Sequence, residues 1–182
     1  MISLIIPAHN EEDRIKKTLE IYEKFLAEKR AEKEIKDFEI IVVINNSKDN
    51  TKEIVERFSK KYPKIKYLDF EQGGKGFAII EGFKEAVKGN SKLIGFIDAD
   101  GATPPEAFYD LIKKIKNYDG IIADRWHKKS KILPKQSLFR RFISRGYNLI
   151  VRSLFLLPFR DTQCGPDRRW LHRHDVDLWR AG

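Results

Sequence analysis

The sequence predicts one α/β domain of the Rossmann-like type, with a mostly parallel central sheet and helices on both faces. Short apolar runs alternate with amphipathic stretches through the first half of the chain, and these runs have no polar face. Strands that are apolar on both sides are typical of a parallel sheet covered by helices. The length of 182 residues suits one such domain.

Five apolar runs are predicted as strands, at residues 3–8, 39–44, 66–70, 92–98 and 120–124. Helical spacing predicts four helices between and after them, at residues 12–33, 50–61, 76–88 and 105–116. We expect Asn10 to cap the first helix, because asparagine is a favoured N-cap residue. We expect Pro105 to open the fourth, because proline fits the first helical turn. Strand–helix alternation of this kind predicts a parallel sheet.

The second half is dominated by basic residues. Residues 125–160 contain ten Lys or Arg and no Asp or Glu, while the net charge of the whole chain is +9. Such a block indicates a partner that carries phosphates, a nucleic acid or an anionic membrane surface. Residues 136–157 are predicted as one helix with a wide apolar surface and only cationic charges. It is either a core helix with solvated arginines or a helix at a membrane interface.

Several classes of protein are excluded. The single cysteine, Cys164, rules out a disulfide framework and a cysteine-based zinc site. No run of apolar residues is long enough to cross a membrane. The first residues have no basic region or cleavage site, so we expect no secretory signal. Residues 166–182 show no clear period, and we interpret them as an atypical tail after a domain at residues 1–165.

Two short motifs point to chemistry. Asp98-Ala99-Asp100 closes an apolar strand, and paired carboxylates at that edge of a sheet can hold a hard divalent cation against a diphosphate. The alternative is a turn before a helix. Gly73-Gly74-Lys75 precedes a helix, where glycines permit close backbone approach and the lysine can meet a phosphate. The alternative is a plain glycine turn, and the spacing is not that of a Walker A loop.

The order of the motifs carries a resemblance. PAHNEE after the first strand, NNSKDNT after the second, then GGKG, DADG and DTQCG resemble the family 2 glycosyltransferases of the GT-A fold. The placing of DTQCG after a helix is similar to the dolichyl-phosphate mannose and glucose synthases. The resemblance covers residues 2–165. It implies a metal-dependent transfer of a hexose from a nucleotide sugar.

The resemblance also implies site residues. The nucleotide-sugar-binding positions are Pro7, Ala8, His9, Glu11, Asn45, Lys75, Asp98, Ala99, Asp100 and Arg125. The catalytic positions are Asp100, Arg125, Asp161 and Gln163. Asp98 and Asp100 are the implied ligands of Mg²⁺ or Mn²⁺. The basic block supplies Arg140, Arg141 and Arg145 as candidates for the acceptor phosphate.

The chain departs from the family pattern at several positions. His9 stands where the family usually has Tyr, and Asp124 where it has Ser before the arginine. Residues 44–47, Ile-Asn-Asn-Ser, stand where the family has Asp-Asp-Gly-Ser, which leaves the base of the donor open. Ala102 stands where some relatives have a Gln ligand. The chain turns to Pro166 where relatives continue with Phe-Lys.

The expected reaction is inverting. The metal would neutralise the diphosphate leaving group, and Arg125 would add charge stabilisation. The acceptor would be a dolichyl or other polyprenyl phosphate, which is already anionic at pH 7 and needs no strong base. GDP-mannose is slightly favoured over UDP-glucose as donor. We expect the enzyme to lie in the cytoplasm, peripherally on the cytoplasmic face of a membrane.

Three alternatives stay open. One is a family 2 transferase with a glycan acceptor, and another is a truncated, inactive relative. The third, of another class, is a basic nucleic-acid-binding module that uses residues 125–160. No pattern of stacking aromatics accompanies that block, and the paired aspartates fit such a module poorly. We therefore expect no nucleic acid as partner.

Overall fold

The computed structural model describes residues 1–115, 118, 120–123 and 176–179. The chain divides into two compact units, Met1–Pro105 and Glu106–Gly182. The first unit contains β1 (Ile2–Ala8), α1 (Ile15–Ala31), β2 (Phe38–Asn45), α2 (Thr51–Lys61), β3 (Ile65–Phe70), α3 (Lys75–Lys88) and β4 (Leu93–Phe96). From its boundary onward follow α4 (Pro105–Ile115), β5 (Gly120–Ala123) and β6 (Val176–Trp179).

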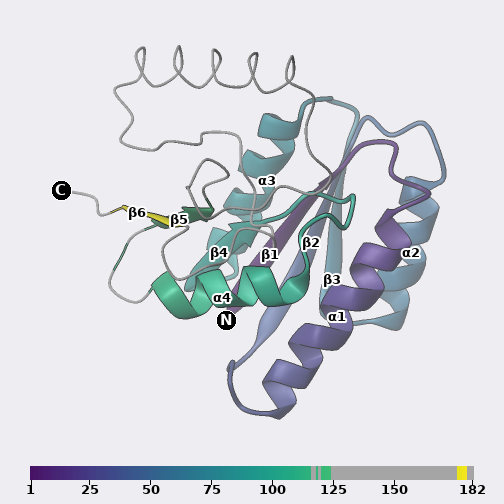
Figure 1. The fold of residues 1–182 in the computed structure, drawn as a ribbon. Helices are drawn as coiled ribbons and strands as arrows, with labels where there is room; N and C mark the ends of the chain where they lie inside the picture. The colour runs from purple at the N-terminus through teal and green to yellow at the C-terminus, as the bar shows by residue number, and fades with distance from the viewer. Residues whose placement is uncertain (116–117, 119, 124–175, 180–182) are drawn as a thin grey trace, which may run out of the picture. The chain divides into compact units, whose positions relative to one another are not determined.

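The first unit is built on a four-stranded parallel sheet in the order β3-β2-β1-β4. The helices α1 and α2 lie on one face and α3 on the other (Figure 1). The chain adds strands to one side of β1 and then returns to add β4 on its other side. In such sheets, ligands bind at the carboxyl ends of the strands where the order reverses.

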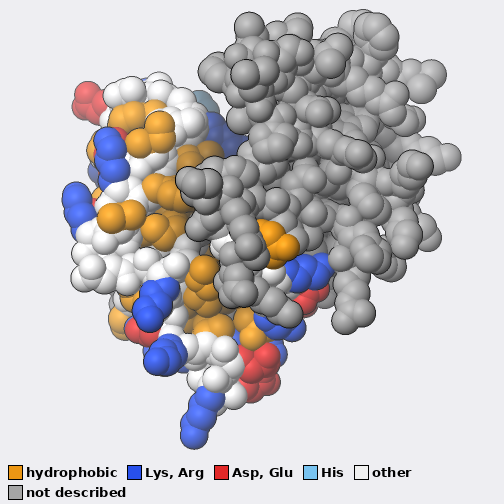
Figure 2. Space-filling model, turned by 90° about the vertical axis from the view of Figure 1, so that its left-hand side faces the viewer, with side chains coloured by type: hydrophobic (Ala, Val, Ile, Leu, Met, Phe, Trp, Pro, Cys, Tyr) orange, Lys and Arg blue, Asp and Glu red, His pale blue; other side chains and the backbone are white. Residues whose placement is uncertain are grey.

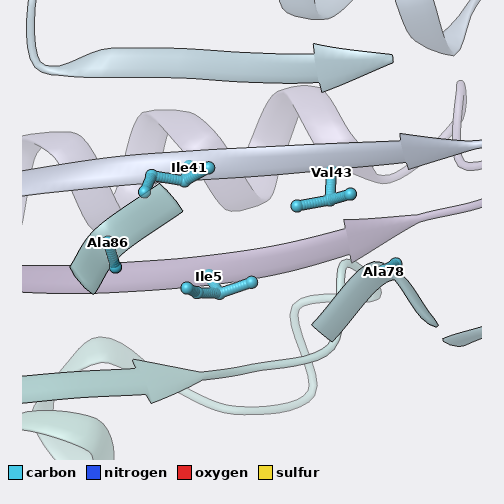
Figure 3. Close-up of a cluster of buried hydrophobic side chains, with 5 residues drawn as sticks. All are labelled: Ile5, Ile41, Val43, Ala78 and Ala86. Carbon is cyan, nitrogen blue, oxygen red and sulfur yellow. The ribbon is translucent and has the colours of Figure 1, made fainter. Parts of the chain in front are cut away.

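The core lies against both faces of β1 and β2, and every residue of these two strands is buried. Toward α3, Ile5, Ile41 and Val43 pack with two alanines of the helix, Ala78 and Ala86 (Figure 3). Small residues let α3 approach the sheet closely. A Cβ on Gly82 would lie 2.5 Å from Ile5 Cγ2, so this helical glycine is required by packing.

Hydrophobic side chains also reach the surface, and Figure 2 shows them on one face among charged side chains. On α3, Ile80 and Val87 are more than half exposed. In the part of the chain that the structure describes, no helix combines the length and hydropathy needed to span a bilayer.

The α/β fold, the four helices and the first four strands are confirmed, with ends that differ by a few residues. The predicted N-cap was wrong. Asn10 has a left-handed backbone with φ 53°, and its side chain accepts a hydrogen bond from Lys48 N–H instead. The helix α1 begins only at Ile15, with Arg14 at its N-cap.

The predicted strand at residues 120–124 is confirmed as β5, but its expected place in the parallel sheet was wrong. The strand β5 pairs antiparallel with β6, in a separate two-stranded sheet. The strand β6 lies in the segment in which we recognised no period. A strand of four residues is too short to show a periodic pattern, so its partner could not be read from the sequence. The predicted helix at residues 136–157 lies outside the described residues.

Candidate active site

A pocket of about 480 Å³ lies at the carboxyl edge of the parallel sheet. It is formed by the loops after β1, β2 and β4 together with the start of α3. Its lining residues are Pro7, His9, Glu11, Arg14, Asn45, Asn46, Gly73, Gly74, Lys75, Asp98, Ala99 and Asp100. This position at a reversal of strand order is a typical ligand site of open α/β sheets.

Two of these loops are joined by hydrogen bonds. His9 Nδ1 donates to the Asn45 carbonyl at 2.8 Å. Asn10 N–H donates to Ser47 Oγ at 3.1 Å, and Asn10 Oδ1 accepts from Lys48 N–H at 2.8 Å. The loops after β1 and β2 therefore form one wall of the pocket.

The end of β2 is fixed by its asparagines. Asn45 is buried, and with its amide nitrogen toward Ala8 it donates to that carbonyl at 2.9 Å and accepts from Gly74 N–H at 3.2 Å. Asn46 has φ 55° and donates from its backbone to the Phe70 carbonyl at 2.7 Å. Asparagine tolerates this left-handed backbone better than most residues with a side chain.

The segment with the paired aspartates is held by α1. Thr18 Oγ1 donates to the Ala99 carbonyl at 2.8 Å, and Tyr22 OH donates to the Thr103 carbonyl at 3.0 Å. Both bonds are buried, where a fixed polar contact is strong. The helix thus orients the backbone on which the two carboxylates stand.

The pocket brings acidic and basic groups together. Asp98 Oδ1 lies 2.5 Å from Lys75 Nζ, and Glu11 Oε2 lies 2.7 Å from Arg14 Nε. Asp100 Oδ1 accepts a hydrogen bond from the backbone two residues on. Burial raises the pKa of the Glu11 carboxyl, and the nearby Asp100 raises it further against the opposing effect of Arg14.

The donor set fits a hard divalent cation. Asp98 and Asp100 both line the pocket, and carboxylate oxygens are the ligands that Mg²⁺ prefers. Among residues 1–115 and the short described segments beyond, no three His, Cys, Asp or Glu side chains form a complete metal cage. A cation held by these two aspartates would therefore take its remaining ligands from water or from a bound diphosphate.

Most of the predicted site residues lie in this pocket. The structure brings together Pro7, His9, Glu11, Asn45, Lys75, Asp98, Ala99 and Asp100. Ala8 is buried and does not line the pocket, although its carbonyl accepts the hydrogen bond from the Asn45 amide. The other predicted residues lie outside the described part of the chain. These are Arg125, Asp161 and Gln163 and the acceptor candidates Arg140, Arg141 and Arg145.

Sequence reasoning missed four contributors, of which Asn46 lines the pocket beside the predicted Asn45. Arg14 lines the pocket, and its spacing of three residues from Glu11 was an available signal. Thr18 and Tyr22 act through contacts with residues 81 positions away. No local pattern announces contacts of that range.

Comparison with known proteins identifies the family to which the chain is similar. Residues 3–173 match the model of glycosyl transferase family 2. The chain is 33% identical over 170 residues to a dolichyl-phosphate beta-glucosyltransferase of Trichomonas vaginalis, covering 90% of this chain and 50% of that protein. It is 32% identical over 152 residues to a dolichol-phosphate mannosyltransferase of Pyrococcus furiosus, covering 83% of this chain and 40% of that protein.

A solved structure supports the fold. A mannosyltransferase from Pyrobaculum calidifontis, in complex with GDP-Man and Mn²⁺, superposes with a TM-score of 0.52 at 21% identity, over 68% of this chain and 34% of that one. The chain spans about half the length of the curated relatives it matches. With the family model matching most of its length, the chain belongs to glycosyl transferase family 2 and has the GT-A fold.

Proposed function

We propose that the chain transfers a hexose from a nucleoside diphosphate sugar to dolichyl or another polyprenyl phosphate, with inversion at the anomeric carbon. The observation that carries this proposal is the meeting of Asp98, Asp100 and Lys75 in one pocket at the carboxyl edge of the sheet. Two carboxylates and a flexible cation are the groups that a metal-bound diphosphate requires. The names of the two relatives supply the acceptor class.

We propose Mg²⁺ or Mn²⁺ as the cofactor, held by Asp98 and Asp100. When bound, the cation would neutralise the charge that develops on the diphosphate leaving group. The backbone of the segment that carries these two carboxylates is held in advance, because Thr18 donates to the Ala99 carbonyl and Tyr22 to the Thr103 carbonyl. Such preorganisation lowers the cost of stabilising charge during reaction.

The wall built by Asn45 and Asn46 would bind the base and ribose of the donor. The Asn45 amide is engaged by hydrogen bonds to Ala8 and Gly74, so we assign it the role of holding the β2 end in place. Asn46 also lines the pocket. We take glucose as the first sugar to test, because the glucosyltransferase relative covers more of this chain than the mannosyltransferase relative.

We also propose that the enzyme works peripherally on the cytoplasmic face of a membrane. A polyprenyl phosphate is confined to a bilayer, so an enzyme that uses it must approach the surface. The ten cations at residues 125–160 support this placement, since basic segments are attracted to anionic lipid. Arg140, Arg141 and Arg145 would then hold the acceptor phosphate.

A thermal-shift assay tests the donor site. It measures the binding of UDP, GDP and their hexose conjugates with and without Mn²⁺. We expect a metal-dependent shift for one base, lost in Asp98→Asn. Asp69→Asn is a matched control, because Asp69 is also a half-exposed carboxylate paired with a lysine, at 2.7 Å from Lys52 Nζ, but does not line the pocket.

Transfer of labelled hexose to a polyprenyl phosphate, compared with a soluble oligosaccharide, tests the acceptor. Product only with the lipid supports the proposal, whereas product only with the oligosaccharide favours the glycan-acceptor alternative. If the folded protein binds no nucleotide with either metal, the active-transferase proposal is wrong. Retention on random oligonucleotides that weakens with salt would instead support the nucleic-acid-binding alternative.

A further inference from the structure

Lys75 is paired with Asp98, a carboxylate for which a metal ion would compete. Its Nζ lies 2.5 Å from Asp98 Oδ1, and it is the first residue of α3. Asp98 is also one of the two carboxylates that fit a divalent cation. A lysine ammonium and a dication at the same carboxylate would repel each other at close range, so each would weaken the other's hold on it.

The balance of charges in the pocket also bears on the competition between Lys75 and a metal ion. Three carboxylates line it, of Glu11, Asp98 and Asp100, and they face two permanent cations, of Arg14 and Lys75. Arg14 is engaged by Glu11. Lys75 is therefore the cation that offsets the two aspartates, and without it the pocket would attract a free dication more strongly.

The backbone that carries Lys75 is held in place, whereas the lysine side chain has room to move. Gly74 has φ 122°, and its N–H is held by Asn45, so the loop that carries the lysine is fixed. The lysine side chain itself is 56% exposed. A Cβ on Gly76 would meet nothing within 4 Å, so the space beside the lysine is open. A long flexible ammonium here can turn from Asp98 to an anion in the pocket.

We propose that Lys75 is an internal counter-ion, which holds Asp98 when the pocket is empty and moves to the diphosphate when metal and nucleotide bind together. The inference rests on the proposed binding of a metal and a diphosphate in this pocket. It follows that Lys75 disfavours metal without nucleotide and favours nucleotide. The lysine would thus be a positioning residue that couples the two ligands.

Lys75→Met tests this, with two measurements on the whole chain. The first titrates Mn²⁺ alone and follows the free ion by electron paramagnetic resonance. We expect the variant to bind Mn²⁺ about threefold to fivefold more tightly, the scale of an exposed ion pair. The second titrates UDP and GDP at saturating Mn²⁺. We expect about tenfold weaker binding of the preferred nucleotide, because a charged contact to phosphate is lost.

Lys52→Met is the matched control, since Lys52 Nζ lies 2.7 Å from Asp69 and is about as exposed, away from the pocket. It should change neither affinity, and Lys75→Arg should preserve the wild-type pattern in part. Circular dichroism checks that each variant is folded. Unchanged or weaker Mn²⁺ binding in Lys75→Met, or undiminished nucleotide binding, overturns the inference. If the wild type binds no nucleotide, the proposed function itself fails, which is a separate outcome.

Discussion

The two edges of the parallel sheet treat polar side chains in opposite ways. At the amino edge, Glu39 is buried on β2, and Ser3, Ser91 and Lys66 all donate to its carboxylate. At the carboxyl edge, the polar groups of the loops line an open pocket. One edge satisfies its polar groups internally and the other directs them to a ligand, as open α/β sheets do.

The largest expected effect is at the amino edge. Glu39→Ala removes the buried carboxylate that accepts from two serine hydroxyls and the Lys66 ammonium, although the hydroxyls still contact each other. We expect the free energy of unfolding to fall by about 2 kcal/mol. Glu85→Ala, which removes a partly exposed carboxylate paired with Lys88, should change it by less than about 0.5 kcal/mol. Urea denaturation measures both, and Mn²⁺-dependent nucleotide binding should survive in the folded fraction. Lost binding at full stability would break the comparison.

A smaller effect is expected where the carboxyl edge meets the core. Asn45→Asp replaces an amide that donates to the Ala8 carbonyl by a group that can only accept when ionised. We expect a loss of about 1 to 2 kcal/mol together with weaker nucleotide binding, measured by thermal unfolding and titration. Asn46→Gly should leave stability within about 0.5 kcal/mol, because glycine suits its left-handed backbone. Equal stability of both variants would contradict the assigned hydrogen bonds.

The residues of the pocket could be predicted from the sequence better than the contacts that hold the pocket in place. The apolar runs of β1 and β2 and the position of Asp98 after β4 follow from local pattern. The contacts of Thr18 and Tyr22 with the aspartate segment do not, since they join residues 81 positions apart. The cap at Asn10 failed for the same reason. Its side chain serves the neighbouring loop, and local helix propensity says nothing of that loop.

The failure at β5 has a different cause. Its apolar run was recognised, but its partner β6 is four residues long and lies more than fifty residues further along the chain. Pairing direction is a property of two strands, and only one of them was visible in the pattern. The sequence therefore predicts the composition of a strand more securely than its neighbour in the sheet.

The edges also differ in how acid affects them. At the amino edge, the hydrogen bond from Lys64 lowers the pKa of the Asp37 carboxyl below its ordinary value of 3.8. A lowered pKa contributes stability that is full above the ordinary value and is lost as the pH falls through the native one. We expect Asp37→Asn to cost at most about 1 kcal/mol near pH 7, less as the pH falls below about 4. Thermal melts across this range measure it, and Lys64→Met should remove most of the pH dependence.

The smallest effect is expected at Glu11, with the opposite sign. Burial raises the pKa of this carboxyl above its ordinary value of 4.5, so ionising it costs more in the native state than in the unfolded state. The resulting penalty is absent at low pH and grows as the pH rises from 4.5 through the native pKa. We expect Glu11→Gln to raise the Tm near pH 7 by no more than about 3 °C, and to leave it unchanged near pH 3.

Glu20→Gln, at an exposed position on α1, is the control and should leave the Tm unchanged at both pH values. A lower Tm for Glu11→Gln near pH 7 would show that the ion pair with Arg14 outweighs burial, and the contrast in sign between the edges would be lost. A raised Tm together with weakened Mn²⁺-dependent nucleotide binding would support the contrast between the two edges. The carboxyl edge would then retain a charge that lowers stability because the ligand requires it, whereas every carboxylate tested at the amino edge stabilises the fold.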